Sequence, residues 1–260
     1  MRVLFLVATT TLLVFFATPR VGNAGEPPVA AKDDIDPDVL RKVKKLIKGT
    51  LSDEAADREK AWAEIKGMGN LVVPGLIGLY RQPETTPPMM GSILIALGDS
   101  KDPRSGPALA EMLMAKDLSV RRDAARAMGD SGYRDGRKVL ESLAVDTKED
   151  DEVRLFAAVA AAKLESQAAL EVLISLLKNK KAEIRSRAVF ALGKYGGVKH
   201  ALTIESVLVD ADKSVREDAV EALRLLNKRE AWGGLVKATG DSDYKVRNAA
   251  MNALKEVTSK

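Results

Sequence analysis

Hydrophobic and small residues recur with a period of 31 residues through most of the chain. The stretch SVREDAVEALRLL begins at Ser214, EIRSRAVFALGKY begins 31 residues earlier, and KVRNAAMNALKEV begins 31 residues later. Two further copies begin at Val120 and Val153, which gives five occurrences of Val/Ile-Arg-x-x-Ala-x-x-Ala. Their arginines are Arg121, Arg154, Arg185, Arg216 and Arg247. A fixed period over several copies predicts a solenoid built from stacked repeats.

Each copy has the apolar spacing of a helix. Relative to the arginine, positions −1, +3, +6 and +7 share one helix face at about 100° per residue. They hold Val or Ile, Ala, Ala and usually Leu or Met, and the small residues let neighbouring helices approach closely. An aspartate precedes four copies at the expected N-cap, where a carboxylate accepts hydrogen bonds from free backbone N–H groups. These residues are Asp117, Asp150, Asp212 and Asp243.

A second apolar set lies between the copies, in stretches such as VPGLIGLY, GPALAEML and QAALEVLISLL. Its Leu or Val residues recur every three to four positions, so each repeat is expected to be two antiparallel helices. Weaker copies around Arg58 and Ala96, with an opening helix from Asp36, bring the expected number to about seven pairs. One pair cannot bury its own apolar faces, but a row of pairs can. The sequence therefore predicts an all-α solenoid over residues 36–260.

The first 24 residues predict a secretory signal peptide, and residues 25–35 predict a flexible leader. Arg2 is followed by an apolar run from Val3 to Phe16, and the segment ends at Gly22-Asn23-Ala24. The run is shorter than the ~20 residues that span a bilayer, which favours cleavage over an uncleaved anchor. We therefore expect an exported protein, periplasmic or secreted, with no stable membrane insertion after cleavage.

The composition argues against several kinds of site. The chain has no cysteine, which excludes disulfides, thiolate metal sites and a cysteine nucleophile. Without Arg2 and Arg20, 39 basic residues face 37 acidic ones, and this net charge of +2 does not indicate nucleic-acid binding. The single histidine, His200, is expected at the surface, because no partner spacing supports a triad. The acidic run from Asp146 to Glu152 lacks the order of a calcium loop. We expect no catalytic residue, no metal site and no cofactor.

The repeated stretch resembles the short bacterial HEAT-like repeat, also called the phycobilin-lyase-type HEAT repeat. The shared pattern is an Asp-containing turn followed by V-R-x-x-A-x-x-A-L-G, and the five arginines of the copies match its Arg. The resemblance covers about Asp36 to the C-terminus. It implies a right-handed superhelix whose V-R-x-x-A helices line the concave side. It also implies that each Arg bonds acidic or carbonyl groups of a turn in an adjoining repeat. Enzymes, enzyme accessories and scaffolds share the repeat, so it does not fix a function.

The arginine column is interpreted as structural rather than as a phosphate-binding ladder. Its side chains lie beside the buried face, where the stem packs while the guanidinium reaches a neighbouring turn.

Positions +1 and +5 point away from the predicted core and form the candidate partner-binding surface. The candidates are Arg122, Arg126, Leu155, Val159, Phe190, Glu217 and Glu221. This surface runs from basic through apolar to acidic, and an exposed apolar patch between charges indicates an interaction surface. The alternative is that Leu155, Val159 and Phe190 are covered by neighbouring repeats. Phe156, beside them, is expected to be internal.

These features predict an exported, non-enzymatic scaffold that binds a protein or peptide of unknown identity in the concave groove. The ligand is expected to be extended or helical, with apolar residues between an acidic and a basic end. The alternative is a tetrapyrrole (bilin)-handling lyase or accessory of the same repeat family. The export signal, the single histidine, the missing cysteine and the 4% aromatic content argue against it. A third hypothesis, a HEAT-like DNA glycosylase, is disfavoured because this chain shows no basic stripe. A role as a structural lattice or homo-oligomer is a further alternative.

Overall fold

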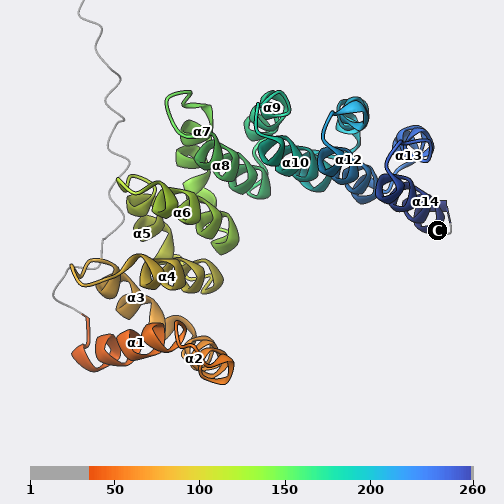
Figure 1. Ribbon diagram of the computed structural model, residues 1–260. Coiled ribbons are helices and arrows are strands. Elements are labelled where there is room, and N and C mark those ends of the chain that lie inside the picture. Colours follow the sequence, from red (N-terminus) through yellow and green to blue (C-terminus); the bar gives the residue numbers. More distant parts are fainter. Residues whose placement is uncertain (1–34, 259–260) are drawn as a thin grey trace, which may run out of the picture.

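Paired helices form a bent array in the computed structural model, which describes residues 35–258 (Figure 1). The expected signal peptide (residues 1–24) and the leader up to residue 34 lie outside the described residues. Within residues 35–258 the chain forms 14 α-helices and no strand. The prediction of an all-α solenoid of about seven two-helix repeats is therefore confirmed.

The helices fall into two layers. The opening pair is α1 (Pro37–Gly49) and α2 (Ala55–Gly67). The outer helices that follow are α3 (Val72–Tyr80), α5 (Ser105–Met112), α7 (Arg137–Val145), α9 (Gln167–Leu176), α11 (Ala201–Glu205) and α13 (Trp232–Ala238). The inner helices are α4 (Pro87–Asp99), α6 (Leu118–Ser131), α8 (Asp151–Lys163), α10 (Ala182–Ala191), α12 (Lys213–Leu226) and α14 (Tyr244–Thr258). The inner helices from α6 onward carry the V-R-x-x-A stretches and line the concave side of the bend (Figure 1).

The predicted N-cap aspartates begin the inner helices. Asp117, Asp150, Asp212 and Asp243 each accept a hydrogen bond of 2.8 Å from the backbone N–H two residues further on. Helices α6 and α12 end at Gly132 and Asn227, whose φ values of 74° and 46° lie in the left-handed region. Glycine and asparagine adopt this conformation more readily than other residues, so the sequence encodes where these helices end.

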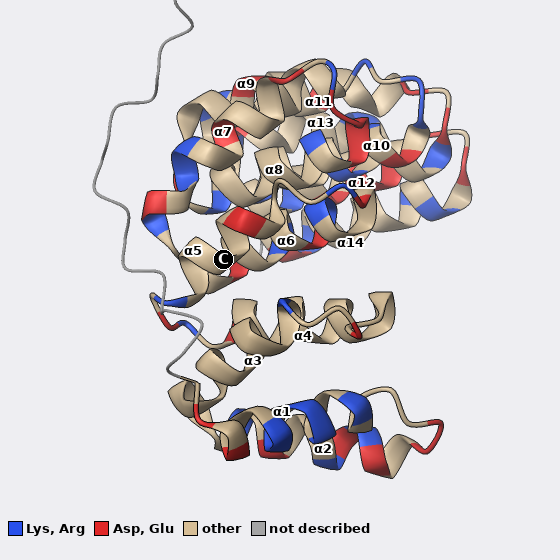
Figure 2. Cartoon of the chain, turned by 90° about the vertical axis from the view of Figure 1, so that its left-hand side faces the viewer, with Lys and Arg blue, Asp and Glu red and all other residues tan. Residues whose placement is uncertain are grey.

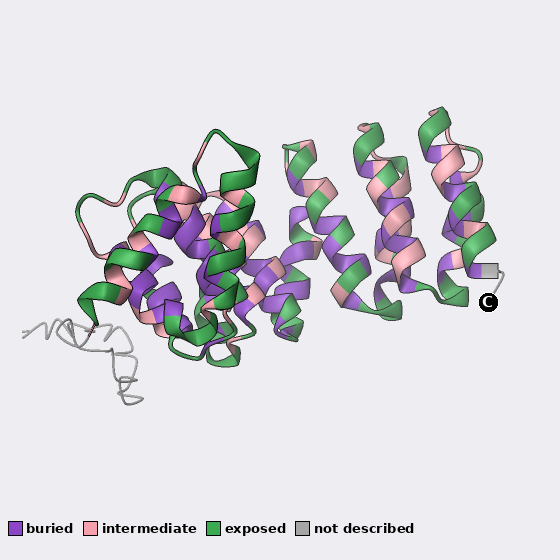
Figure 3. Ribbon diagram, turned by 90° about the horizontal axis from the view of Figure 1, so that it is seen from below, coloured by how far each residue is buried: buried purple, intermediate pink, exposed green. Residues whose placement is uncertain are grey.

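Both alanine columns are buried, and Figure 3 shows buried residues along the stacked helices. Every member of the +3 column is completely buried, and no member of the +6 column is more than 3% exposed. The +3 column is Ala124, Ala157, Ala188, Ala219 and Ala250, and the +6 column is Ala127, Ala160, Ala191, Ala222 and Ala253. The small side chains let the helix backbones come close, which buries the apolar faces that a single pair would leave in water.

Glycines at position +8 bring three pairs of inner helices into backbone contact. A Cβ on Gly98, Gly129 or Gly193 would lie only 3.0, 2.9 or 2.4 Å from the Cα of Ala127, Ala160 or Ala222 in the next inner helix. In α8 the corresponding residue is Ala162. In α12 it is Arg224, and α8 packs less closely on α10 than on α6.

The array changes direction at this boundary. Helices α1 to α6 form one arm and α9 to α14 form the other, with α8 at the corner (Figure 1). On the side seen in Figure 2, α3 and α4 carry few charged residues, whereas α1, α2 and the helices of the second arm carry interspersed basic and acidic ones.

Candidate protein-binding surface

The repeated arginines hold the turn that precedes their own helix. The Nη1 of Arg121 donates to the carbonyl oxygens of Ala115 and Lys116, both at 2.9 Å. Arg185, Arg216 and Arg247 bind the carbonyls five and six residues before them in the same way, as does Arg58 in the first repeat. Each guanidinium thus satisfies carbonyls that the turn would leave without partners.

Three of these arginines also bind a carboxylate in the following repeat. Arg121 binds Glu149 through two bonds of 2.9 and 2.7 Å. Equivalent two-bond contacts join Arg185 to Asp210 (2.7 and 2.8 Å) and Arg216 to Asp241 (2.8 and 3.0 Å). Hydrogen bonds from the arginines lower the pKa of Glu149, Asp210 and Asp241. These bridges tie α6, α10 and α12 to the turns that precede α8, α12 and α14.

Arg154 is the exception, at the corner. Asp210 and Asp241 lie 25 residues after their arginines, and the residue 25 positions after Arg154 is Asn179. An amide carries no charge for a guanidinium, and Asn179 donates at 2.7 Å to Asp151 instead. Arg154 binds Asp151 on its own helix and the carbonyl of Ala144 on α7, both at 3.1 Å. The boundary between α8 and α10 therefore lacks the bridge as well as the glycine.

The candidate surface residues lie on the concave face but differ in exposure. Val159 is half-buried against the core, and Phe190 is 37% exposed. Arg122 forms ion pairs with Asp123 (3.3 Å) and Glu152 (3.6 Å), and Glu221 forms one with Arg224 (2.7 Å). Two of the four charged candidates are thus balanced within the chain. Arg126 is half-buried and Glu217 is exposed, and neither has an ion-pair partner among the described residues.

Leu155 corrects the expectation that position +1 points to solvent. Its side chain is only 1% exposed. The second arm turns inward at α10, so Leu155 faces the region around Ile184 rather than open solvent. Leu155 forms the floor of the concave surface. A polar substitution there would disturb folding, so it could not report on binding alone.

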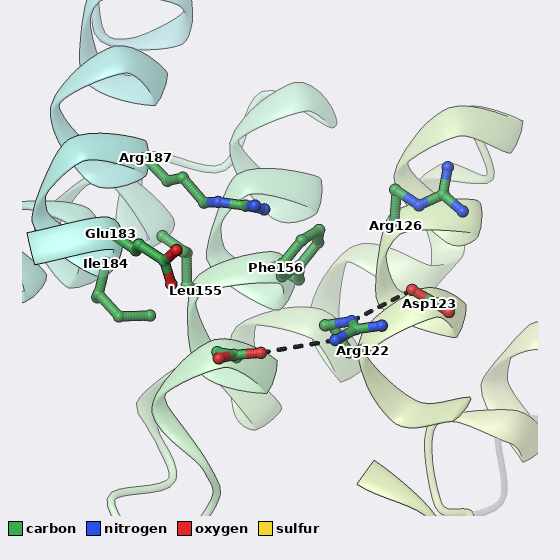
Figure 4. Close-up of a pocket in the computed structure, with 9 residues that line it drawn as sticks. Arg122, Asp123, Arg126, Leu155, Phe156, Glu183, Ile184 and Arg187 are labelled. Carbon is green, nitrogen blue, oxygen red and sulfur yellow. Dashed lines mark hydrogen bonds and ion pairs between the residues drawn. The ribbon is translucent and has the colours of Figure 1, made fainter. Parts of the chain in front are cut away.

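A cavity opens at the corner, between α6, α8 and α10 (Figure 4). It has a volume of about 470 Å³, and Leu155 and Phe156 also line a second hollow of about 290 Å³ that continues to Phe190 and Tyr195. Phe156, expected to be internal, is half-buried in the wall that both share. The guanidinium of Arg122 lies 5.9 Å from its ring centre, and that of Arg187 lies 5.3 Å away. Such distances are within the range of cation–π contacts.

Arg187 is the residue of this surface that the sequence did not single out. It occupies position +2 in α10, as Phe156 does in α8. A straight-helix projection places position +2 at the edge of the outward face, and only the corner brings these two residues together.

His200 is buried, which corrects its expected surface position. His200 ends the 3-10 turn Val198–His200 directly before α11. It is 6% exposed, and its Nε2 has no hydrogen-bond partner among the described residues. Burial, and then the charge of Lys199, lower the pKa of the imidazole, while Glu171 opposes this change. Gly196 lies directly against the ring, and a Cβ there would come within 2.8 Å of the imidazole Cδ2. The histidine thus packs as a neutral core residue.

Replacing His200 with leucine should flatten the pH dependence of stability. Below a pH of about 6.5 the unfolded chain takes up a proton that the buried imidazole does not, so the wild-type protein loses stability as pH falls. We expect the wild type to lose about 1 kcal/mol more than His200→Leu between pH 7.5 and 5. Urea unfolding followed by circular dichroism at both pH values measures this difference. An equal loss in the two proteins would contradict the assignment.

The described residues contain no group of three or more His, Asp or Glu side chains that could hold a metal ion. No helix between residues 35 and 258 has the length and apolar character needed to cross a membrane.

Comparison with known proteins supports the architecture. A family model described as HEAT repeats matches residues 145–204, from the end of α7 into α11. A search of curated proteins gives no match. Among solved structures, an engineered protein is 22% identical with a TM-score of 0.50, over 84% of this chain and 68% of its own. The YibA protein of Escherichia coli is 18% identical with a TM-score of 0.49, over 85% and 82%. A designed armadillo repeat protein in complex with the peptide (KR)4 is 17% identical with a TM-score of 0.45, over 84% and 99%.

Likeness at these identities concerns the fold alone. The family match covers α8, α9 and α10 and reaches into α11, and the helix pairs on either side continue the same stack. Residues 145–204 thus match HEAT repeats, and the described chain has the architecture of an α-solenoid.

Proposed function

We propose that this chain, of the short bacterial or phycobilin-lyase type of HEAT-like repeat, is an exported, non-enzymatic adaptor. It binds a protein or peptide along the concave face of α6, α8, α10 and α12. The observation that carries the proposal is the hollow at the corner, where Phe156, Val159 and Phe190 present apolar surface beside guanidinium groups. Aromatic and arginine side chains in a desolvated depression are the residues that dominate binding energy at protein interfaces.

Export follows from the sequence of the first 24 residues, and it is tested separately. Edman sequencing of protein recovered from the cell envelope or medium should begin at Gly25. A chain that begins at Met1 and stays with the cytosol would contradict this part of the proposal.

Binding is tested by using the purified chain as bait in an extract of envelope and secreted proteins. We expect Phe190→Glu to reduce capture of the partner about ten-fold or more, because a charge replaces an apolar contact at the centre of the surface. Met114→Glu is the matched control, since Met114 is 77% exposed and does not line the corner. Circular dichroism is used to check that both variants are folded. Equal capture by wild type and Phe190→Glu would show that the partner does not bind at this face.

The bilin-handling alternative has its own readout. Adding bilin or haem to the purified protein should leave the visible absorption of the pigment unchanged if the protein is an adaptor. A shifted absorption band would favour the alternative.

A further inference from the structure

Two arginines at the corner differ from the other arginines of the same inner helices. Helices α6, α8, α10 and α12 contain eight arginines, and six of them form ion pairs within the chain. Arg126 and Arg187 form none with the described residues, and both line the cavity of about 470 Å³. Figure 4 shows Arg187 reaching from α10 toward Phe156, with Arg126 on α6 beyond the ring.

The same side of the surface carries a third cation. Lys194, in the π-helical turn Leu192–Gly196 that follows α10, lines the neighbouring hollow together with Phe190. The Nζ of Lys194 lies 5.5 Å from the ring centre of Tyr195, and it has no ion-pair partner among the described residues. The three cations thus flank a strip formed by Phe156, Val159 and Phe190.

Of the acidic residues that line the two hollows, Glu152 and Glu183 lie near the N-termini of their helices, whereas Asp123 and Asp218 occupy the same position, +2, as Arg187. Asp123 and Glu152 pair with Arg122, and Asp218 accepts the hydroxyl of Ser186. Glu183 is exposed without an ion-pair partner in the described chain, one helical turn before Arg187. All of these acidic residues except Glu183 thus have a partner within the chain. The positive charges of Arg126, Arg187 and Lys194, at positions +5, +2 and +9, lack an ion-pair partner among the described residues.

We propose that the corner binds an acidic peptide segment. Its Asp or Glu carboxylates pair with Arg126, Arg187 and Lys194, while an apolar side chain packs on Phe156 and Phe190. Arginines bind carboxylates through two parallel N–H···O bonds, and a guanidinium already placed over an aromatic ring loses little freedom on binding. The inference rests on the proposed binding function, and it specifies the chemistry of the partner.

The test is selection from a library of short random peptides on beads, with the full chain as the labelled receptor. Wild type is compared with Arg126→Gln/Arg187→Gln. The control is Lys228→Gln/Arg229→Gln, which removes two exposed cations outside the cavity that also lack ion-pair partners among the described residues. Selected peptides are then titrated by fluorescence anisotropy. All three proteins are checked by circular dichroism.

We expect wild type and control to select peptides rich in Asp or Glu with a central apolar residue. The Arg126→Gln/Arg187→Gln variant should bind them about ten-fold or more weakly, because two charge-assisted contacts are lost. Selection of basic or neutral peptides, or equal affinity in this variant, would overturn the acidic partner and leave the binding function standing. Failure of the wild type to enrich any peptide would overturn both.

Discussion

Replacing Gly193 with alanine is expected to destabilise the array by about 3 kcal/mol or more. A Cβ on Gly193 would lie 2.4 Å from the Cα and 2.6 Å from the carbonyl oxygen of Ala222 in α12. These are backbone atoms, so no rotamer change relieves the clash, and α12 must move away as a whole. Moving α12 opens the buried contact along the alanine columns, whose close packing stabilises the second arm. Urea unfolding followed by circular dichroism measures the loss.

The matched control is Gly91→Ala. Gly91 lies inside α4, and a Cβ there would meet no other atom within 4 Å. Alanine is favoured over glycine in a helix interior, so we expect a gain of about 0.5–1 kcal/mol. The two substitutions are chemically identical and should differ in sign. A cost below about 1 kcal/mol for Gly193→Ala would show that α10 and α12 separate easily and that their close contact contributes little.

Replacing Arg216 with alanine is the second large expected effect, with a loss of about 3 kcal/mol. The substitution removes the two bonds to Asp241 and leaves that carboxylate, only 8% exposed, without its countercharge. It also releases the carbonyl of Asp210, which the Arg216 Nη1 binds at 2.9 Å. Removing one partner of a buried ion pair costs more than the pair contributes, because the other charge stays desolvated.

Arg247→Ala serves as the control for Arg216→Ala. Arg247 binds the carbonyls of Asp241 and Ser242 at 2.7 and 2.9 Å, and no carboxylate bridge is formed by it in the described chain. We expect its substitution to cost about 1 kcal/mol. Equal losses of stability in the two variants would show that Arg216 stabilises the protein through the turn carbonyls rather than through its ion pair with Asp241.

The effect of Arg216→Ala should also depend on pH. The arginine lowers the pKa of Asp241. The stability that the bridge contributes is therefore complete above the ordinary aspartate pKa of about 4, and it is lost as pH falls through the lowered value. The difference in unfolding free energy between wild type and Arg216→Ala should shrink when both are measured near pH 2.5 instead of pH 7. A difference that stays constant would argue against an ionic contribution.

Two positions in the sequence depart from the repeat pattern at the corner. Ala162 stands where three other copies have glycine, although Arg224 and Lys255 also depart from it, and Asn179 stands where two later repeats have aspartate. Neither exception has meaning until the contacts are known. The role of the glycine depends on a backbone in the next helix, and the role of the acid depends on an arginine 25 residues before it.

The sequence by itself determined the architecture of this protein. The 31-residue period, the alanine columns and the N-cap aspartates predict stacked helix pairs, because each depends on local helix geometry and repeats in every unit. Only the tertiary structure decided which outward positions are available. Leu155 is buried and Phe156 lies in a cavity wall where the arms meet at an angle between α8 and α10. Arg126 and Arg187 line the same cavity and lack carboxylate partners among the described residues. That angle depends on packing between repeats, which the helical periodicity of one repeat does not contain.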